Sequence, residues 1–324
     1  MLGKLLRSLF RRGPPPPVAA TAAGKARLSL ILATRGRPGL FERFVNSVLE
    51  TASEPALLEI MAYVDADDDQ STEYEALVKR LNTPKAGRGA VVRLVVFEPC
   101  GVLRAVSTLA SLATGDIFIA ANDDQVYETP GWDNELRAQA CQYPDQIYIM
   151  RFNDGLESEH NCCFPIISRR FYGLLGYAST AFEHFCADTW FLDLGNRIGR
   201  SVYLRHVMTR HLPAWAGKAE FDATAARTRG PQARLKLMRD IQIYQQTRRY
   251  RELDAGILRR HMLATAGERA NGMEPRKAHF SGVWVSIRAN QVRLAPDMGQ
   301  EPDSPEIAIC SASVPPKPVP EGTA

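Results

Sequence analysis

The sequence lacks any uninterrupted apolar run of the roughly 18–20 residues that a membrane-spanning helix needs. We therefore expect no helix that crosses a bilayer. It also lacks CxxC spacing, which argues against a zinc site. A chain of this length can bury its own core without disulfides, so we expect reduced thiols and a cytoplasmic protein. The six cysteines are Cys100, Cys141, Cys162, Cys163, Cys186 and Cys310.

The body of the chain has no excess of charge of one sign. The formal net charge is +4, but residues 1–27 hold six Lys and Arg and no acid, which leaves 34 basic against 36 acidic residues elsewhere. A nucleic-acid-binding body is usually more basic, so we expect no nucleic-acid partner. With 45% hydrophobic and 23% charged residues, the composition is that of an ordinary globular protein.

The N-terminal segment is the most basic part of the chain. Residues 1–12 (MLGKLLRSLFRR) place leucines and a phenylalanine on one side of a helix and basic residues elsewhere. Such a helix can lie on an anionic membrane surface, here the inner face, and a disordered tail is the open alternative. Pro14–Pro17 and the Ala-rich run to residue 26 predict a stiff linker. We expect four regions: segment and linker 1–26, a main domain 27–230, a helical extension with a hairpin 231–300, and a disordered Pro-rich tail 301–324.

Short apolar runs alternate with helical patterns along the main domain. This alternation predicts an α/β fold with a mostly parallel central sheet flanked by helices. The expected strands are 28–33, 59–64, 91–97, 117–121, 146–150, 164–168 and 201–207. The expected helices are 38–50, 74–81, 103–113, 182–198 and segments within 234–264, followed by a hairpin at 283–287 and 292–294.

Two acidic clusters each follow a predicted strand. Asp65, Asp67, Asp68 and Asp69 follow one strand, and Asp123-Asp124 follow another. Parallel strands end at the same sheet edge, and carboxylates gathered there repel one another unless a cation compensates. Mg²⁺ or Mn²⁺ takes carboxylate oxygens and brings phosphate as a co-ligand. We therefore predict a metal–diphosphate site, although each cluster alone could be a solvated loop with helix-capping Asp.

The first cluster does not form an EF-hand calcium loop. Counted from Asp65, the sixth position is Gln70 instead of the required Gly, and the twelfth is Ala76 instead of Glu.

The order of these motifs resembles that of a GT-A-type glycosyltransferase of family 2, over roughly residues 27–215. The motifs are Thr34-Arg35-x-Arg37-Pro38, Val64-Asp65-x-Asp67-Asp68, Ala113-Thr114-Gly115-Asp116, Asn122-Asp123-Asp124 and Pro130-Gly131-Trp132-Asp133. The resemblance implies a Rossmann-like GT-A fold. Two features depart from the family pattern: extra acids precede Ser71, and Ser107 stands where Asn is common.

The resemblance also implies roles for particular residues. Asp65 and Asp67 would contact the base and ribose of a nucleotide-sugar, and Asp123-Asp124 would be the family's metal–diphosphate element. We expect the donor-binding set to be Thr34, Arg35, Arg37, Asp65, Asp67, Asn122 and Asp123. Asp124 and His211 are the expected ligands of Mn²⁺ or Mg²⁺, with His206 as the competing histidine. A structural histidine is the alternative for either one.

The predicted catalytic base is Asp188. Its segment, Glu183–Trp190, resembles the acidic motif that opens a helix late in the family's catalytic domains. A base opposite the leaving group would invert the anomeric carbon. Asp154 and Glu183 are the next candidates, and a helix cap or surface acid is the alternative role for Asp188.

The predicted function is metal-dependent, inverting transfer of a sugar from a nucleotide-diphospho-sugar, expected to be a UDP-sugar. The acceptor is an unknown glycan, lipid-linked molecule or protein, and we expect the polar segment 153–163 on its side of the site. We expect Trp132 to pack its loop. The alternatives are a sugar nucleotidyltransferase of related fold and a non-catalytic nucleotide- or sugar-binding module.

Overall fold

The computed structural model describes residues 25–158, 160–177, 181–229, 231–265, 284–288 and 291–295. The predicted amphipathic segment 1–12 and the predicted tail 301–324 lie outside these residues. Within the ranges given, no helix combines the length and the apolar character needed to cross a membrane.

The first half of the fold is a parallel α/β unit, as predicted. Its strands lie in the order β3-β2-β1-β4, and all three pairings are parallel. β1 therefore has β2 on one side and β4 on the other, so the carboxyl ends of β1 and β4 flank a topological switch point, where open α/β sheets bind ligands. The elements are β1 (Leu28–Thr34), α2 (Pro38–Thr51), η2 (Pro55–Leu57), β2 (Leu58–Asp65), α3 (Ser71–Leu81), α4 (Pro84–Gly87), β3 (Val91–Phe97), α5 (Val102–Leu112) and β4 (Ile117–Ala120).

The second half makes the sheet mixed. Here β7 is antiparallel to both β4 and β6, β6 is parallel to β8, and β5 is antiparallel to β8. The full order is β3-β2-β1-β4-β7-β6-β8-β5. The elements are β5 (Gln125–Tyr127), α6 (Trp132–Cys141), β6 (Ile149–Asn153), β7 (Ile166–Ser168), α7 (Arg169–Leu175), α8 (Ala187–Ile198), β8 (Ser201–His211), η3 (Ala214–Ala216), α9 (Ala223–Arg229), α10 (Pro231–Gln246) and α11 (Arg248–Thr265).

The predicted C-terminal hairpin is confirmed as β9 (Trp284–Arg288) and β10 (Gln291–Ala295), which pair antiparallel. The helix predicted from residue 182 begins instead at Ala187. Cys186 adopts a left-handed conformation with φ of 64°, and the backbone amides of residues 183–185 donate to the Asp240 carboxylate rather than entering a helix. The boundary predicted at residue 230 remains a prediction.

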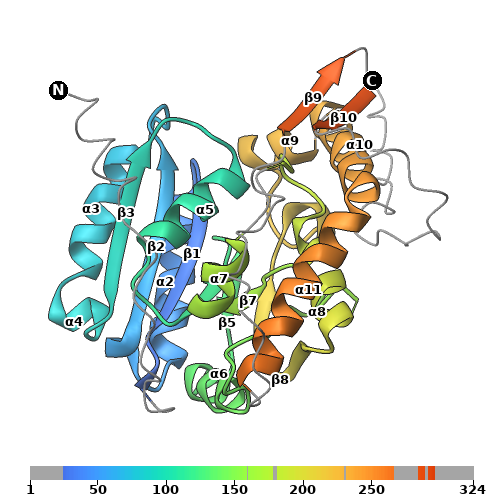
Figure 1. Cartoon of the computed structure of the whole chain (residues 1–324). Coiled ribbons are helices and arrows are strands. Elements are labelled where there is room, and N and C mark those ends of the chain that lie inside the picture. The colour runs from blue at the N-terminus through green and yellow to red at the C-terminus, as the bar shows by residue number, and fades with distance from the viewer. Residues whose placement is uncertain are drawn as a thin grey trace, which may run out of the picture.

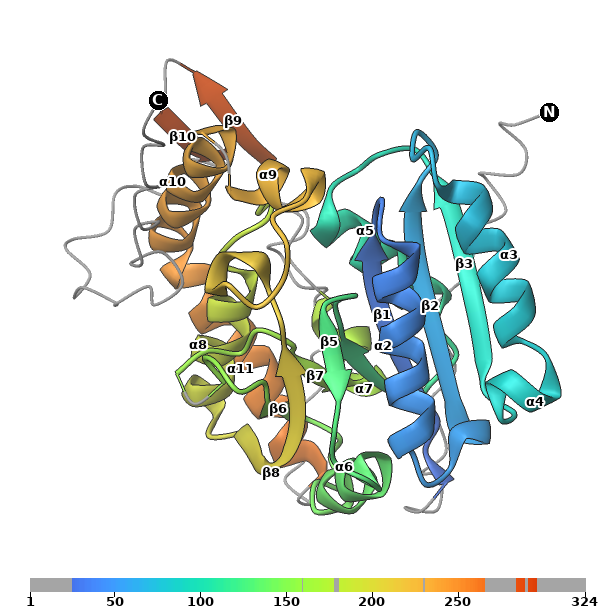
Figure 2. The same ribbon diagram turned by 180° about the vertical axis from the view of Figure 1, so that it is seen from behind.

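Helices cover both faces of the sheet (Figures 1 and 2). Alternate side chains of each strand enter opposite layers, because successive residues of a strand point to opposite faces. In β1, Ile31 packs in the layer that contains α5, α7, α8 and α11, whereas Leu30 and Leu32 pack in the layer that contains α2, α3 and α6. This sandwich leaves the carboxyl ends of β1, β2 and β4 at one rim, where the polar residues gather.

A buried carboxylate in α11 makes stability depend on pH. Asp254 is buried, and burial raises its pKa to about 7. The folded state therefore holds the Asp254 proton more tightly than the unfolded chain, so the contribution of Asp254 to stability falls as pH rises from about 4 to about 7. We expect Asp254→Asn to remove this loss and to gain about 1–4 kcal/mol over wild type at pH 8. Urea denaturation at pH 5 and pH 8 measures the gain, with Asp69→Asn, an exposed carboxylate, as the control; an equal gain at both pH values contradicts it.

Candidate active site

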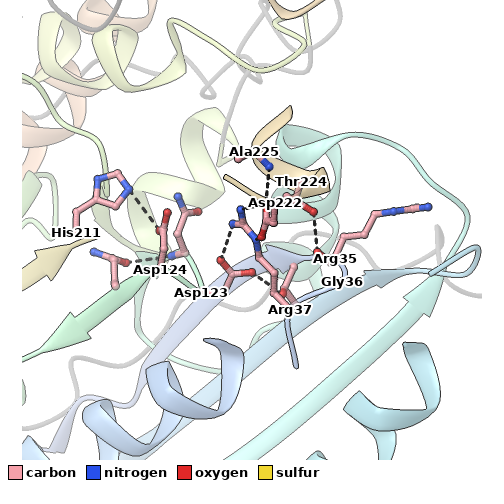
Figure 3. Close-up of polar contacts among 12 residues, drawn as sticks. Arg35, Gly36, Arg37, Asp123, Asp124, His211, Asp222, Thr224 and Ala225 are labelled. Atoms are coloured by element: carbon pink, nitrogen blue, oxygen red, sulfur yellow. Dashed lines mark hydrogen bonds and ion pairs between the residues drawn. The ribbon is translucent and has the colours of Figure 1, made fainter. Parts of the chain in front are cut away.

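The candidate site is built around the turn that follows β4. The amide of Gln125 donates to the Asn122 carbonyl oxygen (3.2 Å), and the Gln125 side-chain oxygen accepts from the Asn122 amide (3.0 Å). β5 then pairs with β8 so that Gln125 lies opposite His211. This pairing brings His211 Nε2 to 3.4 Å from Asp124 Oδ1 (Figure 3). Asp124 and His211, which are far apart in the sequence, therefore lie side by side.

Asp124 and His211 lie close together, but they do not form a good hydrogen bond with each other. Asp124 Oδ1 is buried without a hydrogen-bond partner, and 3.4 Å is too long for a good hydrogen bond to the imidazole. A buried carboxylate oxygen without a partner is costly, and a cation would satisfy it. Within the described part of the chain, no three His, Cys, Asp or Glu side chains are arranged to hold a metal by themselves. The pair nevertheless fits Mg²⁺ or Mn²⁺, which is commonly held by one or two protein ligands with phosphate and water completing the shell.

The competing histidine lies elsewhere. His206 Nε2 contacts Glu135 Oε2 at 3.2 Å, and both side chains are exposed. The structure thus places His211, and not His206, beside Asp124.

Asp123 is the most buried carboxylate of the turn, with 5% exposure. It accepts a hydrogen bond from the Thr34 hydroxyl at 2.7 Å, and Arg37 Nη1 lies 3.3 Å from its other oxygen. Burial raises the pKa of Asp123 to about 6, and the neighbouring Asp124 carboxylate adds to the rise. The charged form of Asp123 is therefore only partly compensated by the protein, which suits a site that receives a cation.

A chain of hydrogen bonds fixes the end of β1. The Arg37 amide donates to the Tyr74 hydroxyl at 2.8 Å, and that hydroxyl lies 2.8 Å from the Thr34 hydroxyl. Thr34 gives its proton to Asp123, so Tyr74 must donate to Thr34. Nothing in the sequence pattern marked Tyr74, which appeared only as a residue of an amphipathic helix.

Arg37 bridges two carboxylates. Its Nε and Nη2 atoms contact the two oxygens of Asp222 at 2.6 and 2.7 Å, while Nη1 faces Asp123. Thr224, two residues further on, donates its hydroxyl to the Arg35 carbonyl oxygen at 2.9 Å. Figure 3 shows this segment, at the start of α9, above the turn that follows β1. Asp222 was not predicted, because its only local signal in the sequence is its place just before a helix.

The first acidic cluster divides into two roles. Asp65 and Asp67 both pair with Arg35, the Asp65 contact at 2.9 Å. Asp68 instead accepts the amides of Gly36 (2.7 Å) and Gln70 (3.0 Å), so it ties two loops together. Arg35 and the carboxylates predicted to bind a nucleoside therefore lie at the rim with Asp123-Asp124, and Asp68 supports them.

Asp188 lies in the first turn of α8. Its Oδ2 accepts from the side-chain amide of Asn161 at 2.7 Å, and its Oδ1 accepts from the backbone amide of Thr189 at 2.8 Å. It is only half-buried, so a second molecule can approach it.

The two other acids considered as bases have structural partners. Glu183 forms ion pairs with Lys236 and Arg239, each at 2.7 Å. Asp154 Oδ1 accepts three backbone amides and one hydroxyl; although burial opposes its charge, these hydrogen bonds hold its pKa below the ordinary value.

The loop after β6 connects the two parts of the site. The amide of His211 donates to the Asp154 carbonyl oxygen at 2.9 Å, so His211 is tied to this loop. Asn161, further along the same loop, holds Asp188. Phe164 packs edge-on against the His211 ring, with the ring centroids 5.0 Å apart. The predicted acceptor-side segment 153–163 thus lies between Asp124–His211 and Asp188.

Trp132 begins α6, away from the rim, against the end of α2. Trp132 is fully buried against Tyr127 and Phe152, which confirms that it packs its loop. Arg210, the neighbour of His211, forms an exposed ion pair with Glu128 at 2.6 Å.

No protein-family model matches the sequence, and no curated protein matches it. Solved structures are similar to it. The mannosyltransferase PcManGT from Pyrobaculum calidifontis, in complex with GDP-Man and Mn²⁺, is 15% identical, with a TM-score of 0.51, covering 84% of this chain and 83% of that chain. TarS 1–349 of S. aureus, in complex with UDP, is 11% identical, with a TM-score of 0.45, covering 85% and 98%. Glucosyl-3-phosphoglycerate synthase from Mycobacterium tuberculosis is 16% identical, with a TM-score of 0.42, covering 69% and 84%. The similarity to the mannosyltransferase, together with the strand order, shows that this chain has the GT-A-like α/β fold that its motifs predicted.

Proposed function

We propose that this protein is a metal-dependent, inverting glycosyltransferase of family-2 type that takes a sugar from a nucleotide-diphospho-sugar. The observation that carries the proposal is the buried, unpartnered Asp124 oxygen beside His211, at the same sheet rim as Asp123 and Arg37. That rim lies at the topological switch point, where α/β folds bind nucleotides.

The donor side is assigned to the ends of β1, β2 and β4. Asp65 and Asp67, held by Arg35, are proposed to bind the base and ribose. Thr34, Arg37 and Asn122 complete the donor side with Asp123. Asp124 and His211 would hold Mn²⁺ or Mg²⁺, and that ion, when bound, neutralises the charge of the leaving diphosphate.

Asp188 is proposed as the catalytic base. It takes the proton from an acceptor hydroxyl as the hydroxyl oxygen bonds to the anomeric carbon. The bond from that carbon to the diphosphate breaks at the same time, and the nucleoside diphosphate leaves with the bonding electrons. Attack from the face opposite the leaving group inverts the configuration.

The comparisons support a nucleotide-sugar as the donor, but they do not identify its nucleobase. PcManGT is described in complex with GDP-Man and Mn²⁺, and a shared fold alone does not carry its donor to this chain. We retain a UDP-sugar as the proposed donor, with a GDP-sugar as the first competitor. The acceptor side is proposed to receive a hydroxyl of a glycan, a lipid-linked molecule or a protein.

Calorimetric titration with UDP, GDP, ADP and CDP, each with and without Mn²⁺, tests the donor site. We expect one nucleotide, UDP, to bind at least tenfold more tightly with Mn²⁺ present, because the metal and the diphosphate share ligands. Selective binding of GDP would show that the nucleobase of the donor is guanine instead of uracil. No binding to any nucleotide would contradict the proposal, and metal-dependent binding without turnover of any UDP-sugar, measured as released UDP, would favour a binding module.

A further inference from the structure

We propose that Asn161 is a positioning residue that fixes the carboxylate of Asp188 in the orientation needed to take the acceptor's proton. The inference rests on the proposed function and adds a residue that the sequence motifs did not mark. Three observations support it: the contact with Asp188, the rigid hold on Asn161 itself, and the presence of a second carboxylate beside it.

The contact restrains Asp188 from rotating. Asn161 Nδ2 donates to Asp188 Oδ2 at 2.7 Å, while the Thr189 amide donates to Asp188 Oδ1 at 2.8 Å. The Thr189 hydroxyl also donates to Oδ1, at 3.4 Å, so Thr189 holds one carboxylate oxygen and Asn161 holds the other. A hydrogen bond to an ionised group is stronger than one between neutral groups, so both restraints are firm. Oδ2, which has a single donor, keeps a lone pair for the acceptor hydroxyl.

Asn161 is itself immobilised. Its side chain is 4% exposed, and its Oδ1 accepts from the Cys162 amide at 2.9 Å. Its own amide donates to the Glu157 carbonyl oxygen at 2.8 Å. Because the Cys162 amide can only donate, it fixes which end of the Asn161 side chain is oxygen, and the NH₂ group must face Asp188.

A second carboxylic acid, Glu157, lies close enough to Asp188 to disturb the orientation of its carboxylate. Glu157 is half-buried and lies four residues before Asn161, whose backbone amide donates to the Glu157 carbonyl oxygen. Burial raises the pKa of Glu157, and the charges of Asp188 and Asp154 raise it further, so these acids lie within electrostatic reach of one another. Two neighbouring carboxylates tend to share a proton or turn apart. The hydrogen bond from the Asn161 amide group to Asp188 Oδ2 keeps Asp188 in one position beside this second acid.

The test compares Asn161→Ala with Asn196→Ala, an exposed asparagine on α8 that serves as the matched control. We expect Asn161→Ala to lower kcat about ten- to a hundredfold with the donor KM unchanged, because only the orientation of the base is lost. Asn196→Ala should retain wild-type kcat. Thermal unfolding of Asn161→Ala checks that the variant is folded, and Asn161→Gln, which keeps an amide donor but displaces it by one methylene, should also lower kcat.

A double-mutant cycle with Asp188→Asn separates positioning from a general structural role. If Asn161 acts through Asp188, Asn161→Ala should change the residual kcat of the Asp188→Asn enzyme by less than twofold. An equal loss in both backgrounds, or no loss in the wild-type background, would overturn the inference. Failure of wild type to consume any donor would instead overturn the proposed function, so the two failures are distinguishable.

Discussion

Asp188→Asn is expected to lower kcat by roughly a hundredfold to ten-thousandfold, the range that general base catalysis contributes. The substitution keeps the shape of the side chain, and its amide oxygen can still accept the hydrogen bond from Asn161. What it removes is the ability to take a proton from the acceptor hydroxyl. The donor KM and the nucleotide affinity should therefore stay within about twofold of wild type.

The measurement is release of nucleoside diphosphate at saturating donor, with titration of the nucleotide as the binding control. Glu75→Gln, which removes one negative charge from an exposed position of α3, should retain full turnover. Unchanged turnover in Asp188→Asn would remove Asp188 from the base role. A parallel loss of nucleotide affinity would mean that the substitution disturbs the donor site and not the chemistry.

Asp124→Ala should abolish the Mn²⁺-dependent gain in nucleotide affinity and lower kcat/KM by about a hundredfold to a thousandfold. The reason is that the buried Asp124 oxygen is the free carboxylate position next to His211. A divalent ion contributes several kcal/mol of charge stabilisation, and each factor of ten in rate corresponds to about 1.4 kcal/mol. Calorimetry with and without Mn²⁺ measures the first effect, and turnover measures the second.

The histidines supply a matched pair for this experiment. His211→Ala should weaken Mn²⁺-dependent binding, whereas His206→Ala should leave it unchanged, because His206 lies at an exposed pair with Glu135. Thermal unfolding of each variant without nucleotide checks that the fold is intact. Retention of metal-dependent binding in a folded Asp124→Ala protein would show that the metal is held elsewhere or is not used.

Much of the site's location could be read from the sequence. Asp65 and Asp123 each follow an apolar run, and in a parallel sheet such residues must meet at one edge. The strong strand signals came from residues buried on both faces, such as those of β1 and β2. The local sequence pattern was sufficient to predict these strands, because the α/β unit is built from segments that are neighbours in the chain.

The remainder depended on contacts that leave no local pattern. β5 has only three residues, too few to show a period, yet its pairing with β8 is what brings His211 to Asp124. The reversed direction of β7 is likewise invisible in its apolar sequence. Asn161 and Asp222 looked like ordinary polar loop residues, because their partners Asp188 and Arg37 are distant in the chain.

The Arg37–Asp222 contact joins residues 185 positions apart. During synthesis, the parallel sheet of β1 to β4 could form long before Asp222 leaves the ribosome, but the site would then lack the carboxylate that holds Arg37 from the other side. A nucleotide that needs the whole site would bind only chains that have folded through α9. Because a ligand stabilises only the state that binds it, donor present in the cell would selectively protect the completed fold from proteolysis.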